Sequence, residues 1–356
     1  MRYYSGNLTS TGVPMLRPSI EKVLAGKDLS RQEASEVFNA IMDGQCSEIQ
    51  MAAFLTGLRM KGESRDEIVA ATTAMRSRSI HVPIDHRRNR VLDTCGTGGD
   101  GTNTFNISTT VALLLSAHGG IKVAKHGNVS NSSKSGSADL IRALGVHMDA
   151  TPQHIATSLE QCNLGFIFAA NHHPAMKYAA PVRRGLGIRT IFNILGPLTN
   201  PAGAPYQLMG VFDPQILETL AEVLLELGSR RVVLVSGMDG MDEVTLCADT
   251  KVVIGTAGDI RTMEFNPETI GFHKVVPDEI RGDTPEVNRD IALGILKGSI
   301  SGARRDIVIL NAAFALYAAE ITDDIREGVE IARGLLDSGK AWEACQRFVE
   351  FNRSSE

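Results

Sequence analysis

The chain has 356 residues, of which 43% are hydrophobic and 22% are charged, and its formal net charge is −5. That length suggests about two domains, and the acidic balance gives no global argument for a nucleic-acid or membrane partner. Five scattered cysteines without a C-x-x-C pair predict neither a disulfide framework nor a zinc site. The sequence has no apolar run of about 18 residues and no signal-peptide core at its start. We therefore expect a cytoplasmic protein.

Residues 17–82 predict a succession of helices. A serine followed three residues later by glutamate is the capping-box pattern of a helix start, and it occurs as Ser30 with Glu33 and as Ser64 with Glu67. Residues 48–60 carry apolar side chains at helical spacing, namely Ile49, Ala52, Phe54, Leu55 and Leu58. We expect a small all-α domain over residues 16–83, serving as an interface or a lid.

From about residue 90, short apolar runs alternate with helical stretches. This alternation is typical of βαβ units, and it predicts an α/β domain over residues 84–356 with a mostly parallel central sheet flanked by helices. The expected strands are residues 91–95, 121–125, 166–169, 208–212, 231–235, 252–255 and 306–310. A cap residue before proline predicts helix starts at Thr151-Pro152 and Asp213-Pro214, and Gly228 is expected to end the second of these helices.

A glycine-rich turn over residues 93–101 follows the first expected strand. Glycines allow backbone N–H groups to approach an anion, and a helix starting near Ser108 would add free donors and a favourable dipole. Asn106, Ser108 and Thr109 offer side-chain donors at the same place. The turn is neither a dinucleotide-binding G-x-G-x-x-G nor a Walker A sequence. We expect an anion site here, with an ordinary capped turn as the alternative.

A second polar segment, Lys125-His-Gly-Asn128, ends the next expected strand, and the serine-rich residues 132–137 then open a helix. Lysine is a point charge suited to phosphate. Because open α/β sheets bind ligands at the carboxyl ends of their strands, this segment and the glycine-rich turn are expected at one edge. A plain surface turn is the alternative.

The third segment is M-D-G-M-D-E, residues 238–243, after the apolar residues 231–235. The adjacent carboxylates of Asp242 and Glu243 would be costly at the end of a buried strand without a positive partner. Mg²⁺ is such a partner, since it is usually held by one or two carboxylates together with substrate phosphates. A solvated acidic turn is the alternative.

Residues 174–205, rich in arginine, glycine, proline and asparagine, break the alternation of strands and helices. We expect this segment to run between the two domains, to complete the helical one in part and to line a cleft, with an irregular stretch over residues 192–201. Arginine binds planar carboxylates through two parallel hydrogen bonds, so Arg183, Arg184 or Arg189 is a candidate for an aromatic acid. The paired histidines 172 and 173 have no matching acidic or cysteine ligands nearby.

Together these segments favour an enzyme that positions a polyphosphate ester and neutralises its departing charge. The order and spacing of four blocks resemble the anthranilate phosphoribosyltransferase family, which has the nucleoside phosphorylase-like fold. The blocks are GTGGDG with TFNIST, KHGN with SSKSGSAD, HPAMK with PVRRGLGIRT and LGPLTNP, and DGMDE. The resemblance runs from about Leu16 to Glu350, and the residues before it have no trusted counterpart.

The resemblance implies transfer of the phosphoribosyl group of phosphoribosyl pyrophosphate (PRPP) to the amine of anthranilate, a step of tryptophan biosynthesis. It implies an active site in a hinge cleft, one or two Mg²⁺ ions and a homodimer formed through the helical domain. No side chain is expected to act as a general acid or base, since Lys125 and Arg183 would contribute by positioning.

The resemblance also assigns residues. PRPP would be held by Gly96, Gly98, Gly99, Asp100, Thr104, Asn106, Ser108, Thr109, Lys125 and Ser137. Anthranilate would be received by Gly96, His126, Asn128, His173, Arg183 and Pro197. Magnesium would be bound by Ser108, Asp242 and Glu243.

One position departs from the family pattern, because Val129 follows the KHGN asparagine where arginine is frequent. Two other functions share this fold. A pyrimidine nucleoside phosphorylase would use phosphate as the acceptor without needing the Asp242–Glu243 pair. A non-catalytic relative that binds nucleic acid should show a basic face, which the net charge of −5 disfavours.

Overall fold

The computed structural model describes residues 16–130 and 134–353, which form two compact units. One unit ends its first stretch at Arg78 and also contains Pro174–Leu195, whereas the other comprises Ser79–His173 and the chain from Gly196 onward. The sequence places the first of these divisions five residues later, after residue 83. The expected fold class, a helical domain and a larger α/β domain with a mostly parallel sheet, is confirmed.

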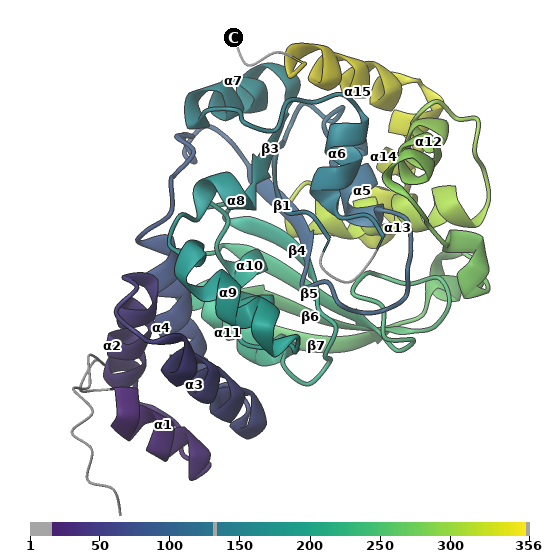
Figure 1. Ribbon diagram of the computed structural model, residues 1–356. Coiled ribbons are helices and arrows are strands. Elements are labelled where there is room, and N and C mark those ends of the chain that lie inside the picture. The colour runs from purple at the N-terminus through teal and green to yellow at the C-terminus, as the bar shows by residue number, and fades with distance from the viewer. Residues whose placement is uncertain (1–15, 131–133, 354–356) are drawn as a thin grey trace, which may run out of the picture. The chain divides into compact units, whose positions relative to one another are not determined.

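Over residues 16–78 and 174–195, the helical unit contains four consecutive helices, α9 from later in the chain and the first residues of α10 (Phe192–Leu198) (Figure 1). Their bounds are α1 Leu16–Leu24, α2 Arg31–Met42, α3 Glu48–Lys61, α4 Arg65–Arg76 and α9 Met176–Leu186. Helix α9 packs on α2 and α3. A Cβ added to Gly44, between those two helices, would lie 2.5 Å from the ring of Tyr178, so α9 requires glycine at that turn.

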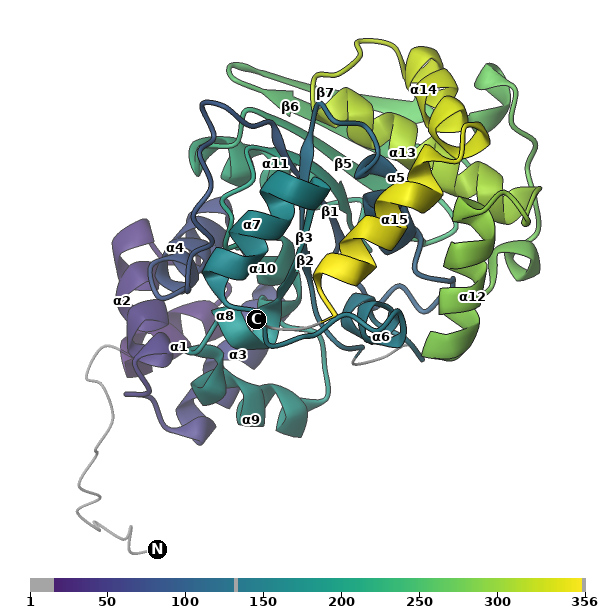
Figure 2. The same cartoon turned by 90° about the horizontal axis from the view of Figure 1, so that it is seen from above.

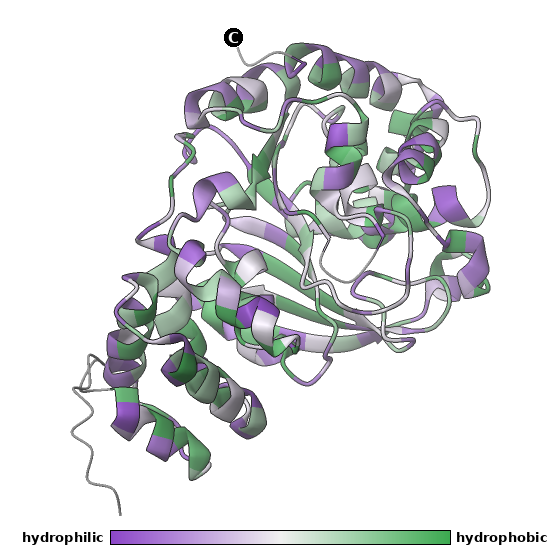
Figure 3. Ribbon diagram, viewed as in Figure 1, coloured by the Kyte–Doolittle hydropathy of each residue, from purple (hydrophilic) through white to green (hydrophobic). Residues whose placement is uncertain are grey.

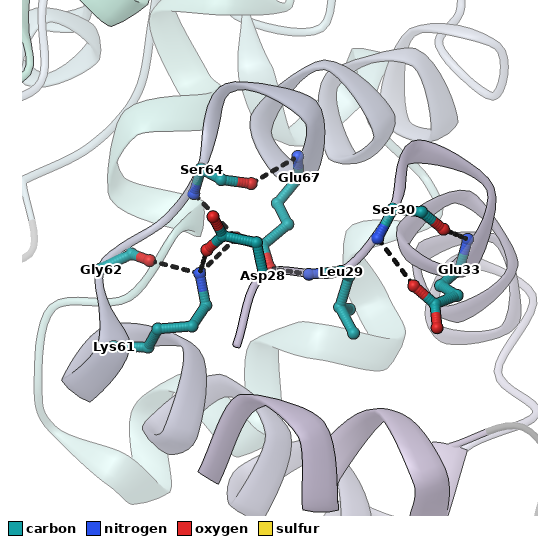
Figure 4. Close-up of polar contacts among 8 residues, drawn as sticks. All are labelled: Asp28, Leu29, Ser30, Glu33, Lys61, Gly62, Ser64 and Glu67. Carbon is teal, nitrogen blue, oxygen red and sulfur yellow. Dashed lines mark hydrogen bonds and ion pairs between the residues drawn. The ribbon is translucent and has the colours of Figure 1, made fainter. Parts of the chain in front are cut away.

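Both predicted capping boxes are confirmed, but their glutamates lie in different surroundings. Glu67 is fully buried and accepts hydrogen bonds from the backbone N–H groups of Ser64 (2.7 Å) and Leu29 (2.9 Å) and from Lys61 Nζ (2.9 Å) (Figure 4). Glu33 has a similar set of partners at the surface. This single buried carboxylate therefore joins the first turn of α4 to Lys61 at the end of α3 and to Leu29 just before α2.

The apolar residues predicted for α3 divide between two faces. Phe54, Leu55 and Leu58 are buried, whereas the side chain of Ile49 is 84% exposed and lies outside the buried stripe. Ile49 lies on the same side of the helix as Met60, which is 80% exposed, because eleven residues make about three turns. The helix therefore has a second apolar stripe that its own unit leaves uncovered.

The prediction of an irregular stretch over residues 192–201 is wrong, and the longer segment 174–205 is mostly helical. It contains α9 and α10 Phe192–Leu198, with Pro181 and Pro197 inside those helices. Each proline removes one backbone donor, which disfavours a helix when local sequence alone is considered. Ala179 and Val182 are buried on α9, so packing offsets the lost hydrogen bond. Gly187 ends α9 in the left-handed region, with φ 62°.

The α/β unit contains a seven-stranded sheet of order β3-β2-β1-β4-β5-β6-β7. The first five strands are parallel, and β6 and β7 are antiparallel additions at one edge. Their bounds are β1 Val91–Gly96, β2 Lys122–Gly127, β3 Leu164–Phe168, β4 Tyr206–Gly210, β5 Arg231–Gly237, β6 Thr250–Thr256 and β7 Asp259–Phe265. The mostly exposed edge strand β7 lacks a continuous apolar run, and the sequence did not predict it.

Two further predictions fail for local reasons. Residues 306–310 lie in the helix α13 Ala303–Ala318 and not in a strand, because a short apolar run fits a buried helix equally well. Pro214 precedes α11 Leu217–Glu226 without forming its first turn, whereas Thr151 does cap α7 Pro152–Cys162 as predicted. Gly228, with φ 98°, follows the end of α11 as expected.

Helices cover both faces of the sheet (Figure 2). Helices α5 Ile107–Leu115 and α13 pack on one face, and α7 and α11 pack on the other. An outer layer on the α5 side comprises α14 Ile325–Asp337 and α15 Lys340–Phe351. Figure 3 shows the central strands mostly hydrophobic, while α15 alternates polar and apolar residues. No described helix combines the length and apolarity that a bilayer span requires.

The remaining elements are short or lie at the rim of the α/β unit. They are α6 Ser137–Ala143, α8 Ala169–His172, α12 Pro285–Leu296 and the 3-10 turns Pro267–Ile270 and Pro277–Ile280. Helix α6 contacts α12, which brings two segments far apart in the sequence together. This contact places α12 beside the loops that follow the first two strands.

The buried carboxylate of the helical unit gives a stability prediction. Glu67→Ala should lower the free energy of unfolding by about 2–3 kcal/mol, because it leaves two backbone N–H groups without a buried acceptor, while Lys61 keeps Asp28 and the carbonyl of Gly62. Urea unfolding would measure the loss. Glu33→Ala is the matched control, since its half-exposed ion pair with Lys22 should contribute less than about 1 kcal/mol. Equal losses in the two variants would contradict the prediction.

Candidate active site

The carboxyl ends of the parallel strands meet at one edge of the sheet, and four of the five strands end in glycine. In the register of the sheet, Gly96 at the end of β1 lies beside Gly210 at the end of β4. Neighbouring connections leave in opposite directions between these two strands, which is where open α/β sheets bind ligands. We call Gly96 and Gly210 the glycine pair.

The loop that carries Asp242 lies directly against the glycine pair. A Cβ added to Gly96 would lie 2.4 Å from Asp242 Oδ2, and one added to Gly210 would lie 1.5 Å from the Asp242 carbonyl oxygen. The backbone N–H of Gly98 donates a hydrogen bond of 2.7 Å to the same Oδ2. The absence of side chains at both strand ends therefore allows this carboxylate to lie on the edge of the sheet.

Glu243 lies at the start of α5, where the N–H of Ser108 donates to its Oε1 at 3.1 Å. The next residue, Val244, exchanges two hydrogen bonds with the buried side chain of Asn311 on α13 (3.0 and 2.8 Å). Sequence reasoning assigned no role to Asn311, although a single asparagine within the apolar run of α13 is a signal of a buried polar contact.

Burial makes the carboxyl groups of Asp242 and Glu243 weaker acids. It raises the pKa of Asp242 from 3.8 to about 7, with further repulsion from Asp100, and it raises the pKa of Glu243 well above its usual value, with Asp242 as the next cause. The nearest cation is Lys125, 3% exposed, whose Nζ contacts the carbonyl of Thr94 and, at 3.3 Å, Ser108 Oγ. Negative charge therefore exceeds positive charge at this edge.

This excess fits a divalent cation. In the described part of the chain, no group of three or more His, Cys, Asp or Glu side chains is arranged to hold a metal ion by itself. Mg²⁺ does not require such a group, because it usually takes one or two carboxylates and completes its shell with substrate phosphates and water. Asp242, Glu243 and the hydroxyl of Ser108 are hard oxygen donors of the required kind.

The glycine-rich turn is formed by left-handed backbone and held by its own polar groups. Gly98, Gly99 and Gly101 all have positive φ angles, which glycine adopts without a steric penalty. Asp100 accepts hydrogen bonds from the hydroxyl and the N–H of Thr102. Farther along, Thr104 forms an isolated bridge with Arg281. Thr109 lies in the first turn of α5 and is buried.

The second loop lies beside the first. Asn128 and Ser137 contact each other, since the N–H of Asn128 donates to Ser137 Oγ (3.1 Å) and that hydroxyl contacts the Asn128 carbonyl (3.3 Å). The amide of Asn106 bonds to Ser135 from the first loop. Val129, whose side chain is exposed, donates its N–H to Asn128 Oδ1. Ser132 and Ser133, part of the predicted phosphate loop, lie outside the described residues.

His126 and His173 form a neutral pair near these loops. Burial lowers the pKa of His126 well below 6.5 and that of His173 to about 4, and their Nε2 atoms lie 3.2 Å apart. His126 also has a hydrogen bond to the backbone of Gly196, and Nδ1 of His173 lies 3.1 Å from Ser79 Oγ. Neither ring is a cation near neutral pH.

Two predicted anthranilate residues have structural partners of their own. The carbonyl of Pro197 accepts a hydrogen bond of 2.6 Å from Gln207 on β4. Arg183 belongs to α9 in the helical unit, where its guanidinium lies 5.5 Å from the ring centre of Phe192. Arg183 is half-buried, whereas Arg184 and Arg189 are exposed, a distinction that the sequence did not make.

The chain matches two family models over nearly all of its length. Residues 17–79 match the helical bundle domain and residues 88–342 the a/b domain of the glycosyl transferase family. The anthranilate phosphoribosyltransferase of Persephonella marina is 46% identical over 339 residues, which are 95% of this chain and 99% of that protein.

Solved structures agree with these matches. The Thermus thermophilus anthranilate phosphoribosyltransferase superposes with a TM-score of 0.87 at 42% identity, over 94% of this chain and 99% of that one. The Saccharomyces cerevisiae enzyme in complex with PRPP and Mg also gives a TM-score of 0.87, at 26% identity, over 96% of this chain and 98% of its own. The protein therefore belongs to the anthranilate phosphoribosyltransferase family.

Proposed function

We propose that this protein transfers the phosphoribosyl group of PRPP to the amine of anthranilate, giving N-(5-phosphoribosyl)anthranilate and pyrophosphate in tryptophan biosynthesis. The observation that carries the proposal is the carboxylate pair, Asp242 and Glu243, held between the glycine pair and the start of α5 beside Lys125. This arrangement suits a ligand that combines several phosphate charges with a metal ion.

In the proposed reaction, the C1–O bond to pyrophosphate breaks, the amine nitrogen bonds to C1, and the amine loses one proton to solvent. Lys125 and the positive end of the α5 dipole would stabilise the leaving charge through preorganised electrostatics. Magnesium, one or two ions held by Ser108, Asp242 and Glu243, would neutralise further charge on pyrophosphate when bound. An arylammonium is strongly acidic, so this chemistry needs no strong base, in keeping with the neutral histidines.

The residues proposed to bind PRPP share an edge of the sheet and supply backbone N–H groups, hydroxyls and one ammonium. They are Gly96, Gly98, Gly99, Asp100, Thr104, Asn106, Ser108, Thr109, Lys125 and Ser137. For anthranilate we propose Gly96, His126, Asn128, His173, Arg183 and Pro197, with the Arg183 guanidinium pairing with the carboxylate. The five cysteines are all free thiols, which supports a reducing, cytoplasmic compartment.

We also propose a homodimer formed through the helical unit. The exposed stripe on α3, with Ile49 and Met60 as its largest members, continues in Leu24 of α1, which is 62% exposed. Exposed apolar residues gathered on two neighbouring helices are typical of an association surface. Ile49→Glu should convert a dimer to a monomer in analytical ultracentrifugation without changing helix content, and Val276→Glu, at an exposed apolar residue of the α/β unit, is the control. A wild-type monomer would exclude this interface.

The primary test is a fluorescence assay that follows the loss of anthranilate on addition of PRPP, with and without Mg²⁺. Magnesium-dependent consumption at enzyme-like rates would establish the reaction. Metal-independent phosphorolysis of a pyrimidine nucleoside would instead indicate the phosphorylase, and absence of both reactions with tight binding of nucleic acid would indicate the non-catalytic relative.

Arg183 gives a prediction about substrate recognition. Arg183→Ala should raise the KM for anthranilate by about 10- to 100-fold, because a charge-assisted hydrogen-bonded pair is lost, and it should leave the KM for PRPP within about twofold. Steady-state kinetics with each substrate varied in turn would separate the two constants. Arg184→Ala, on the same helix but exposed, is the matched control and should change neither constant. An unchanged anthranilate KM in Arg183→Ala would remove this residue from the site.

The raised pKa of Asp242 gives a prediction about pH. The folded-state pKa is about 7 and the ordinary value 3.8, so the stabilisation from neutral Asp242 is present below about pH 4 and is lost as the pH rises through 7. Because metal binding requires the carboxylate, Mg²⁺ should release more protons at about pH 5.5 than at about pH 8 and should bind more tightly at the higher pH. Calorimetry of Mg²⁺ alone in two buffers would measure this, with Asp242→Asn as the blank. Equal proton release at both pH values would contradict it.

A further inference from the structure

A buried asparagine of α12, Asn288, connects this helix to the loops proposed to bind PRPP. Its side chain is 2% exposed, with Oδ1 accepting the backbone N–H of Asp283 at 2.9 Å. Its Nδ2 donates to Oδ1 of Asn106 at 3.0 Å. The two asparagines are 182 residues apart in the sequence.

The contact with Asp283 fixes the orientation of the Asn288 side-chain amide. The backbone N–H of Asp283 is only a donor, so the atom of Asn288 that faces it must be the carbonyl oxygen. The amide nitrogen of Asn288 therefore faces Asn106 and presents a donor. That donor in turn requires Asn106 to present its own carbonyl oxygen, so the orientation of one amide determines the orientation of the other.

A second contact reinforces the orientation of Asn106. The hydroxyl of Ser135 donates to the same Oδ1 at 3.1 Å, and Nδ2 of Asn106 donates to the carbonyl of Ser135 at 3.1 Å. The carbonyl oxygen of Asn106 thus accepts two hydrogen bonds. The second N–H of the Asn106 side-chain amide makes no hydrogen bond within the described residues, so the group that Asn106 can offer a ligand is a donor. An anion is bound by donors and repelled by a carbonyl oxygen.

The segment that carries Asn288 is held firmly against both loops. The N–H of Gly282 donates to the carbonyl of Asn103 (3.0 Å), and a Cβ added to Gly282 would lie 2.5 Å from Cα of Phe105. Asp283 forms an ion pair of 2.6 Å with Lys134 in the other loop. These contacts position Asn288 beside both loops.

We infer that Asn288 is a positioning residue for PRPP, because together with Ser135 it holds the remaining amide N–H of Asn106 toward the ligand and the carbonyl oxygen of Asn106 away. Asn288 does not itself contact the substrate. The inference rests on the proposed function, since it assumes that Asn106 binds a phosphate-bearing ligand.

The test is Asn288→Asp. The introduced carboxylate still accepts the N–H of Asp283 but no longer donates to Asn106, so it favours the reversed amide. The dissociation constant for PRPP in calorimetry and the KM for PRPP should both rise on the order of tenfold or more. At saturating PRPP, kcat and the KM for anthranilate should stay within about twofold of wild type.

A double-mutant cycle decides whether the effect passes through Asn106. In an Asn106→Ala background, Asn288→Asp should change PRPP binding by less than about twofold, because the amide that it orients is gone. A tenfold effect that persists in that background would overturn the inference. An unchanged PRPP affinity in the single variant, with a lower Tm, would also overturn it and leave Asn288 with a purely structural role.

Two further variants separate positioning from a general loss of stability. Asn352 is 6% exposed and donates to Ser158 Oγ at 3.0 Å in the same unit, so Asn352→Asp should lower Tm without changing PRPP affinity. If Asn288→Asp does not fold, Asn288→Ala tests the same relay by removing the donor without adding charge, and it should show a smaller rise in the same constant. PRPP binding without turnover in the wild-type protein would count against the proposed function while leaving this inference testable by calorimetry.

Discussion

Two adjacent carboxylates, Asp242 and Glu243, are buried at the edge of the sheet beside Lys125. The desolvation of these two carboxylates is the constraint on which the rest of the site depends. Taking an ionised carboxylate out of water costs several kcal/mol unless charge or hydrogen bonds replace its hydration. Backbone N–H groups, among them those of Gly98 and Ser108, donate to these carboxylates but leave most of the cost unmet. The raised pKa values express that deficit, and a cation bound with substrate would remove it.

The surrounding scaffold holds the carboxylates in place despite this cost. The glycine pair allows the backbone to approach the sheet, and Asn311 ties the residue after Glu243 to α13. In the same manner, Asn288 orients the side-chain amide of Asn106 in the loop that precedes α5. Both asparagines are fully or nearly fully buried, and both direct a loop through the amide rather than by contact with a ligand. The site is therefore preorganised by side chains that belong to the core.

Sequence reasoning succeeded where the signal is local. The capping boxes, the glycine-rich turn and the carboxylates after a strand all depend on neighbours within a few residues, and β1, β2 and β5 were predicted in place. It failed for residues 306–310 because a short apolar run does not distinguish a strand from a buried helix, and for α9 because proline outweighed packing that only the fold supplies. Asn288 and Gly210 could not be recognised because their partners lie far away in the chain, and the partner of Asn311 could not be identified for the same reason.

The helical unit is assembled from two separated stretches, and this affects how the chain folds as it is synthesised. Helices α1 to α4 emerge first, but α9, which packs on α2 and α3, follows only after β1, β2 and β3. An N-terminal domain usually folds as a unit when it leaves the ribosome. Here the first unit must wait with apolar helix surface uncovered for about 100 residues of further synthesis, or some 5–20 s at usual elongation rates. Apolar surface that is exposed for such an interval makes a nascent chain prone to aggregation.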